Sequence, residues 1–130
     1  MIGRRQARRQ ALFLLYQWDV TGEPLASLFD GDVDPFARDL ADAVVRRADE
    51  LDERITAAAT DWPADRLGAV ERNALRMAVH ELESGDVPAE VAISEAVALA
   101  KRYASEDAAR LVNGILGRIH REIWGANQLF

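Results

Sequence analysis

Four arginines near the start of the chain, Arg4, Arg5, Arg8 and Arg9, have the residue type and spacing for binding phosphate. On a helix, Arg5, Arg8 and Arg9 fall within a sector of about 100°, turned away from the apolar stripe that begins at Ala7. A guanidinium group binds phosphate through paired hydrogen bonds and stacks on unpaired bases. Arginines at a helix N-terminus also oppose the helix dipole, which disfavours a purely structural role. The pattern therefore indicates a surface for single-stranded RNA, with a solvated first turn as the alternative.

The arginines stand out because the chain as a whole is acidic. Its formal net charge is −6, and because the first ten residues contribute +4, the remaining residues carry −10. An acidic body repels a polyanion at long range, so we expect any RNA binding to be local and assisted by a partner. No apolar run approaches the roughly 20 residues that span a bilayer, so we expect no membrane association and read the first residues as mature protein.

Other residues that carry chemistry are sparse. The chain has no cysteine, which excludes disulfides and thiolate sites and favours a cytoplasmic setting. His80 and His120 have no second ligand at metal-binding spacing, and an acidic pair such as Glu81 with Glu83 fits a helix surface better than acid–base catalysis. No glycine-rich phosphate loop or nucleophile motif occurs. We therefore expect no metal, no cofactor and no enzymatic activity.

Apolar residues recur at helical spacing throughout, and alternation of period two is nowhere sustained. The sequence predicts an all-α fold of five main helices, with short extra turns near 25–29 and 63–67. The first helix is expected over 4–20, with Tyr16 on the arginine side, although core packing is the simpler explanation for that residue alone. A long second helix should begin at the cap Asp34 and end near Trp62-Pro63. The others should begin near 67, after Pro88 and at Ser105.

One helical domain over 1–130 is expected, with a seam between two small subdomains near 62–66. Within the last helix, Asn113-Gly114 interrupts an apolar run, where glycine costs about 1 kcal/mol relative to alanine. Close helix packing is the simpler explanation, and Gly117 one turn later supports it. The alternative is the approach of a ligand or partner to the backbone.

Several segments, in this order and spacing, resemble the NusB family of transcription antitermination factors. They cover nearly the whole chain and comprise the basic start 4–8, the segments 11–12 and 15–18, Val70–Ala78 with Glu81-Leu82, Val87-Pro88 with 91–97 and 99–101, and Leu111–Leu116. The resemblance implies an all-α fold of two small three-helix subdomains packed into one compact helical domain. Ser94 and Gly117 depart from the family, which usually has Asn and Asp there.

The resemblance also implies a non-enzymatic function. NusB-like proteins pair with NusE, a small-subunit ribosomal protein, and the pair binds the boxA element of nascent ribosomal RNA transcripts, which keeps RNA polymerase termination-resistant within an antitermination complex. Carried over residue by residue, the resemblance assigns RNA contact to Arg4, Arg5 and Arg8, with Arg9 as an addition. It assigns the partner surface to Tyr16, Glu71, Asp107, Asn113 and Gly114.

Two alternatives stay open from the sequence. A NusB-like domain also occurs as an RNA-binding accessory module at the N-terminus of ribosomal RNA methyltransferases; on that reading, we expect methylation to need a separate subunit. The other alternative is a homo-oligomeric scaffold in which Leu12, Phe13 and Tyr16 pack against a second copy. The sequence does not decide between monomer and homodimer.

Overall fold

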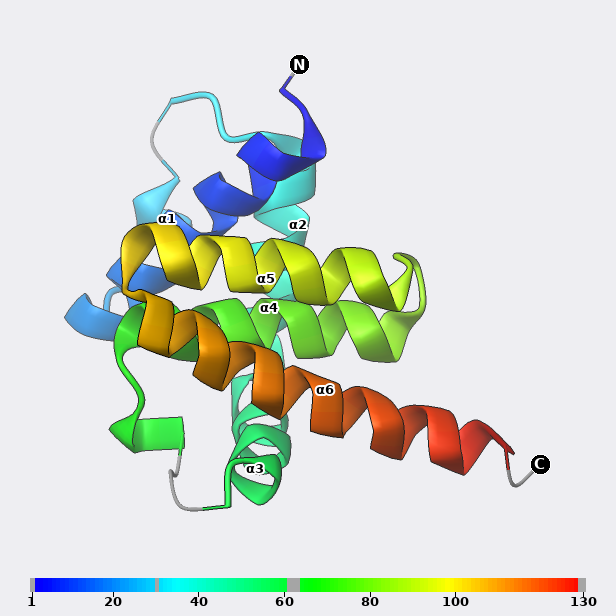
Figure 1. Ribbon diagram of the computed structural model, residues 1–130. Coiled ribbons are helices and arrows are strands. Elements are labelled where there is room, and N and C mark those ends of the chain that lie inside the picture. Colours follow the sequence, from blue (N-terminus) through cyan, green and yellow to red (C-terminus); the bar gives the residue numbers. More distant parts are fainter. Residues whose placement is uncertain (1, 30, 61–63, 129–130) are drawn as a thin grey trace.

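The computed structural model describes residues 2–29, 31–60 and 64–128, and within these ranges the regular elements are all helical. The predicted all-α class is therefore confirmed (Figure 1). In order, these elements are α1 (Arg4–Thr21), η1 (Leu25–Leu28), α2 (Pro35–Arg46), α3 (Ala48–Ala58), η2 (Ala64–Arg66), α4 (Ala69–Ser84), α5 (Ala89–Tyr103) and α6 (Glu106–Gln128), where η marks a short 3-10 turn.

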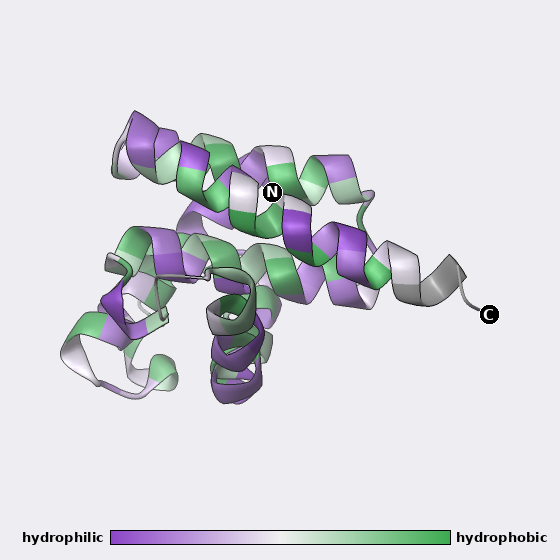
Figure 2. Ribbon diagram, turned by 60° about the horizontal axis from the view of Figure 1, so that its bottom comes forward, coloured by the Kyte–Doolittle hydropathy of each residue, from purple (hydrophilic) through white to green (hydrophobic). Residues whose placement is uncertain are grey.

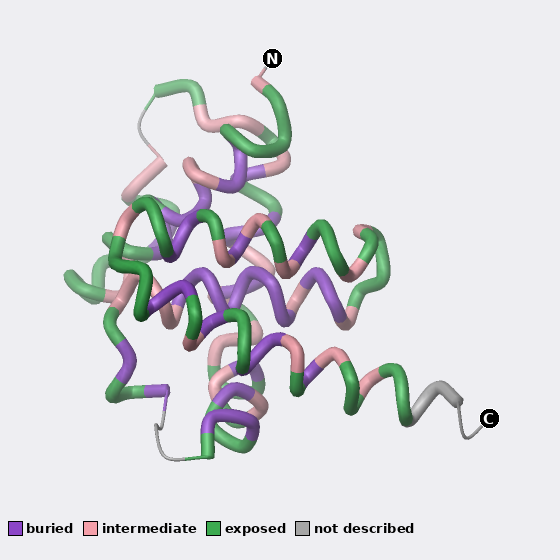
Figure 3. The backbone as a smooth tube through the Cα atoms, viewed as in Figure 1, coloured by how far each residue is buried: buried purple, intermediate pink, exposed green. Residues whose placement is uncertain are grey.

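Helix α4 forms the centre of the molecule and contacts all five other α-helices. Every residue from Asn73 to Val79 is buried, and Figure 3 shows α4 as the most continuously buried helix. In Figure 1, α4 and α5 run side by side, α6 slants away from them, and α2 and α3 cross behind. Apolar residues gather along the faces that the helices turn toward one another, as Figure 2 shows. A single apolar core thus runs through both halves of the chain.

The predicted seam falls partly on Trp62-Pro63, which lie outside the described residues. The adjoining turn predicted at 63–67 is present as η2. A division into two subdomains along that seam stays a prediction. No described helix is long and apolar enough to cross a membrane.

Helix α1 begins and ends close to where the sequence predicts. Gly22 closes it in the left-handed conformation at φ 75°, which glycine adopts without a steric penalty. The predicted stripe is buried at Ala7, Ala11, Leu14 and Leu15. The opposite face of α1 is left open to solvent around the arginines.

The single long helix predicted from Asp34 to Trp62 is wrong, because the chain breaks at Arg47 into α2 and α3. The N-cap is correct, since the Asp34 side chain accepts a hydrogen bond of 2.9 Å from the Phe36 amide. At the break, the Arg47 guanidinium donates to Glu50 and also to His80 and Glu83 of α4. These polar contacts hold the break against α4, and apolar periodicity gives no sign of them.

Asp19 ties the end of α1 to the beginning of α4. Its Oδ2 lies 2.8 Å from Arg72, 3.0 Å from the Asn73 amide nitrogen and 3.2 Å from Arg76. Arg76 also reaches Asp52 of α3 through two hydrogen bonds of 2.7 Å. This network joins three helices and satisfies polar groups that the core would otherwise leave without partners.

The explanation of Gly114 by close helix packing is wrong. A Cβ built on Gly114 would meet nothing within 4 Å, and the residue is exposed. At Gly117 the nearest atom is the flexible end of Arg121, at 3.4 Å. No neighbouring backbone comes close enough to either position to require a glycine. For Gly114, the other explanation raised by the sequence remains, which is the approach of a ligand or partner.

Candidate nucleic-acid interface

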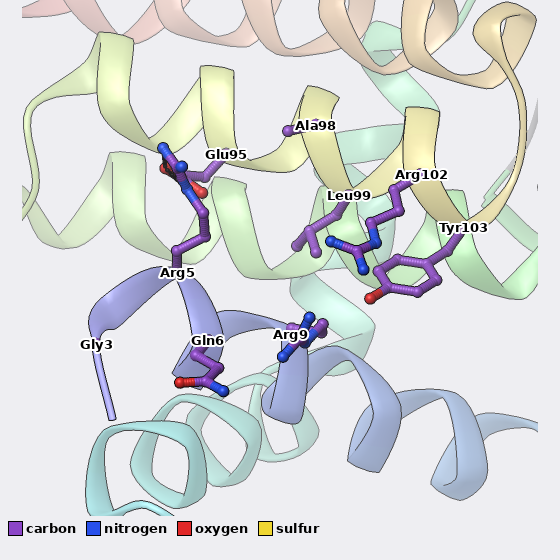
Figure 4. A pocket seen from close by; sticks show the side chains of 9 residues that line it. All are labelled: Gly3, Arg5, Gln6, Arg9, Glu95, Ala98, Leu99, Arg102 and Tyr103. Atoms are coloured by element: carbon purple, nitrogen blue, oxygen red, sulfur yellow. Dashed lines mark hydrogen bonds and ion pairs between the residues drawn. The ribbon is translucent and has the colours of Figure 1, made fainter. Parts of the chain in front are cut away.

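A cavity of about 390 Å³ lies between the first two turns of α1 and the second half of α5 (Figure 4). Helix α1 contributes backbone and side chains from its N-terminus, and α5 contributes one face of its last three turns. The lining residues are Gly3, Arg5, Gln6, Arg9, Glu95, Ala98, Leu99, Arg102 and Tyr103. Two segments about 90 positions apart in the chain thus form one concave surface.

Three arginines face this cavity and only one carboxylate does. Arg5 has an exposed side chain and donates two hydrogen bonds of 3.3 Å to Glu95, which is mostly covered. Arg9 and Arg102 line the cavity from opposite helices. An exposed ion pair of this kind contributes little stability, so a phosphate group can replace Glu95 as the partner of Arg5. The cavity is therefore locally basic on an acidic protein.

The start of α1 adds to this positive field. Its N-cap, Gly3, makes no side-chain hydrogen bond, and the first turn contains no acidic residue. The free backbone amides and the positive end of the helix dipole therefore remain available to an anion. The guanidinium of Arg4 lies 4.0 Å from the ring centre of Phe36, a cation–π contact that steadies an otherwise exposed side chain.

The expectation that Arg8 points outward with the other arginines is wrong. Arg8 is buried and donates two hydrogen bonds, of 3.1 and 2.8 Å, to the two carboxylate oxygens of Glu81 on α4. It also lies over the ring of Phe36 at 5.3 Å. The helical wheel misplaced Arg8 because a paired guanidinium can be buried on the apolar side of α1. In this structure Arg8 seats the helix, and Arg5 and Arg9 face the cavity.

The sequence reasoning missed Arg102 and Tyr103. The Arg102 guanidinium lies 5.4 Å from the ring centre of Tyr103, and that ring meets Phe13 edge to face at 5.1 Å. Tyr16, one turn further along α1, is exposed, so its packing into the core is excluded. The sequence does show a basic residue followed by an aromatic residue at the end of α5. Their place in the site follows only from the packing of α5 beside α1.

The residues assigned to a partner surface occupy different elements. Tyr16 is near the end of α1, Glu71 is in the first turn of α4, and Asp107 is in the first turn of α6. These three helix ends lie at one side of the molecule, on the left of Figure 1. Asn113 and Gly114 are exposed further along α6.

The two acidic residues of this set, Glu71 and Asp107, have partners within their own helix ends. Glu71 accepts a hydrogen bond of 3.1 Å from the Gly68 amide and so caps the start of α4. Asp107 is exposed and pairs with Arg110 one turn later. Asp107 is exposed and Glu71 is partly exposed, so neither carboxylate is shut off from solvent.

His80 is a partly buried histidine on α4, beside the break between α2 and α3. Burial, together with the nearby positive charge of Arg47, lowers the pKa of His80 below its ordinary value. Arg47 donates to His80 Nδ1 at 2.7 Å, and a guanidinium can only donate, so this ring nitrogen is an acceptor. Among the described residues, no group of three or more His, Asp or Glu side chains could hold a metal ion.

Comparison with known proteins gives consistent matches over nearly the full chain. The NusB family model matches residues 5–121. The transcription antitermination protein NusB of Solibacter usitatus is 37% identical over 95% of this chain and 92% of its own, and that of Rubrobacter xylanophilus is 40% identical over 95% and 94%. A crystal structure of antitermination factors NusB and NusE with double-stranded RNA superposes with a TM-score of 0.82 at 36% identity, covering 92% of this chain and 96% of that one.

Family model, relatives and fold agree with the motifs that run from the basic start to the Asn113-Gly114 signature. The similarity spans both the arginine-bearing helix α1 and the helices α4 to α6 that pack against it. On this basis, the chain belongs to the NusB family.

Proposed function

We propose that this protein is a transcription antitermination factor that binds boxA-type RNA at the α1–α5 cavity, together with a NusE-type ribosomal protein. The observation that carries the proposal is the convergence of three arginines and a tyrosine on one cavity of a protein whose net charge is −6. Such a site attracts a polyanion locally and leaves the rest of the molecule to a basic partner. We place this function in the cytoplasm.

Each cavity residue has a specific role in this proposal. Arg5 and Arg9 bind phosphate oxygens, and Arg5 exchanges Glu95 for a phosphate when RNA arrives. Arg4 adds charge at the rim, and the Tyr103 ring supplies a face for an unpaired base. Flat aromatic and guanidinium surfaces suit single-stranded RNA better than a duplex, whose bases are already stacked.

The NusE-type partner is proposed to contact Tyr16, Glu71, Asp107 and Asn113, with Gly114 at the edge of the surface. Three of these lie where helix ends meet, and two carry negative charge. Acidic groups opposite a basic ribosomal protein accelerate association and select the correct partner. The solved complex of NusB, NusE and double-stranded RNA, which superposes on this fold, supports a protein that binds both a NusE-type partner and RNA.

We expect this task to involve no catalytic turnover. The relatives from Solibacter usitatus and Rubrobacter xylanophilus are antitermination proteins, which favours that function over a methyltransferase accessory module. The scaffold alternative is not favoured by the named relatives; of its three residues Leu12 is buried, whereas Tyr16 and Phe13 are exposed and the Phe13 ring also meets Tyr103.

The test is a fluorescence-anisotropy titration of a boxA RNA, a scrambled RNA of equal length and a boxA duplex, each with the protein alone and with NusE. We expect tightest binding to single-stranded boxA with NusE present. Arg5→Ala and Arg9→Ala should each flatten the dependence of log affinity on log salt by about 0.7. Arg46→Ala on α2 is the matched control, because Arg46 is exposed and remote from the cavity. Equal affinity for all three RNAs with and without NusE would contradict the proposal.

A further inference from the structure

A second hollow, with a volume of about 470 Å³, lies between the end of α3 and the middle of α6. We call it the α3–α6 groove. Its α3 side is made of small residues from Ala58 to Thr60, and its α6 side carries three arginines around a glycine. The lining residues are Ala58, Ala59, Thr60, Arg110, Leu111, Gly114, Ile115, Arg118 and Arg121. None of these arginines has a role in the site described above.

The charged residues among those that line the groove are all arginines. Arg118 donates to the Ala58 carbonyl at 3.5 Å and to the exposed Glu122 at 3.4 Å, and both distances indicate weak contacts. Arg121 has no carboxylate within 4 Å in the part of the chain that the structure describes. Arg110 pairs with Asp107, which lies outside the lining. On a protein of net charge −6, three guanidiniums around one groove are a local reversal of sign.

Gly114 opens the middle of this groove. Nothing lies within 4 Å of the position where its Cβ would be, so the helix surface there is bare backbone facing open space. A side chain at this point would project between Arg110 and Arg118, one turn to either side on α6. The missing side chain therefore leaves a continuous path past the arginines, with Leu111 and Ile115 beside it.

We infer that the α3–α6 groove is a second RNA contact, at which Arg118 and Arg121 bind backbone phosphates and Gly114 admits the strand. The inference rests on the proposed function. Charge complementarity selects the occupant, because planar guanidinium forks without a carboxylate in the lining match the phosphodiester groups of an RNA backbone. An acidic protein segment is the competing occupant, and the test separates the two.

The groove and the α1–α5 cavity lie apart in the fold. In Figure 1 the start of α1 is at the top and the end of α3 at the bottom, with α4, α5 and α6 between them. An RNA that fills the first site must therefore continue over the surface to reach the second. Loss of the groove should weaken the binding of a long RNA and leave that of a short RNA unchanged.

The experiment compares Arg118→Gln/Arg121→Gln with the control Arg46→Gln/Arg66→Gln, which makes the same charge change at two exposed residues outside both sites. The probes are the shortest single-stranded boxA RNA that binds the unaltered protein with NusE and an RNA twice as long. For the long RNA, the groove variant should lower the salt slope by about 1.4, at about 0.7 per phosphate contact, with no change for the short RNA. The control should leave both slopes unchanged.

A second variant, Thr60→Glu, tests the same path without removing an arginine, because Thr60 is exposed and lines the groove on the side opposite the arginines. It should weaken binding of the long RNA only. Equal salt slopes for the groove variants and the control variant would overturn the inference. A groove variant that binds an acidic peptide more weakly than the unaltered protein does, but binds the long RNA equally well, would also overturn it. If Arg5→Ala weakens RNA binding while both groove changes do not, the proposed function stands and only this inference fails. If the unaltered protein binds no RNA, both fail.

Discussion

The buried pair Arg8–Glu81 gives the sharpest test of how α1 is held. Both side chains are only 6% exposed, and two hydrogen bonds of 3.1 and 2.8 Å join them. Glu81→Gln keeps the shape of the side chain and removes its charge, which leaves the Arg8 guanidinium in the core without a counter-charge. Breaking a buried pair in this way costs about 3–5 kcal/mol. Since a domain of this size has a total stability of about 5–15 kcal/mol, the loss should be large.

Urea denaturation followed by circular dichroism measures this loss. The control is Glu122→Gln, whose exposed pair with Arg118 should contribute well under about 1 kcal/mol. Arg8→Met/Glu81→Met completes the comparison, because replacing both charges leaves neither unpaired and should recover much of the stability. If Glu81→Gln destabilises the protein no more than Glu122→Gln, the buried pair does not hold α1 in place.

The same variants separate the structural and RNA roles of Arg8. If Arg8 acts by seating α1, the folded Arg8→Met/Glu81→Met protein should keep nearly unaltered RNA affinity. A salt slope lowered by about 0.7 in that protein would show instead that Arg8 contacts phosphate directly.

Three further predictions address the cavity and the acidity of the core. Glu95→Gln should strengthen RNA binding in a filter-binding assay, because it removes the carboxylate that competes for Arg5; weaker binding would contradict the exchange of partners. Gly3→Asp should raise thermal stability slightly by capping α1 and lower RNA affinity by adding a negative charge at the anion site; unchanged affinity would exclude that helix end from the interface. Because the pKa of His80 is lowered on folding, the unfolded chain binds more protons below a pH of about 6.5, so the unfolding free energy should fall as pH drops through that region. Urea midpoints across that range should fall less for His80→Gln than for the unaltered protein, and an identical fall would refute this source of pH dependence.

Local signals in the sequence predicted local structure well. The Asp34 cap and the Gly22 stop depend on backbone chemistry within a few residues, and both are where the sequence places them. Helical periodicity also identified the buried stripe of α1 and the all-α class. Such features need no knowledge of the tertiary fold.

What could not be predicted depends on contacts between distant segments. The break at Arg47 is held by residues of α4, and the burial of Arg8 depends on Glu81, 73 positions away. A helical wheel assigns arginine to the surface because it includes no residue of another helix, and so omits the Glu81 carboxylate that allows Arg8 to be buried. The error at Gly114 has a different origin, since glycine in a helix signals close approach without saying whether the neighbour lies within the protein.

The candidate site was half visible from the sequence. The basic start of α1 indicated RNA by charge alone, whereas Arg102 and Tyr103 became part of the site only when α5 was placed beside α1. When two distant segments form one binding surface, the sequence alone does not show that they lie together.

The central claim is that RNA binds at the α1–α5 cavity, and amide chemical-shift mapping by NMR tests it most directly. A boxA RNA would be titrated into the isotope-labelled protein in complex with unlabelled NusE. We expect the largest shifts in the first turns of α1, around Arg5 and Arg9, and in the last turn of α5, around Arg102 and Tyr103. Shifts confined to other helices, with these two segments unchanged, would contradict it.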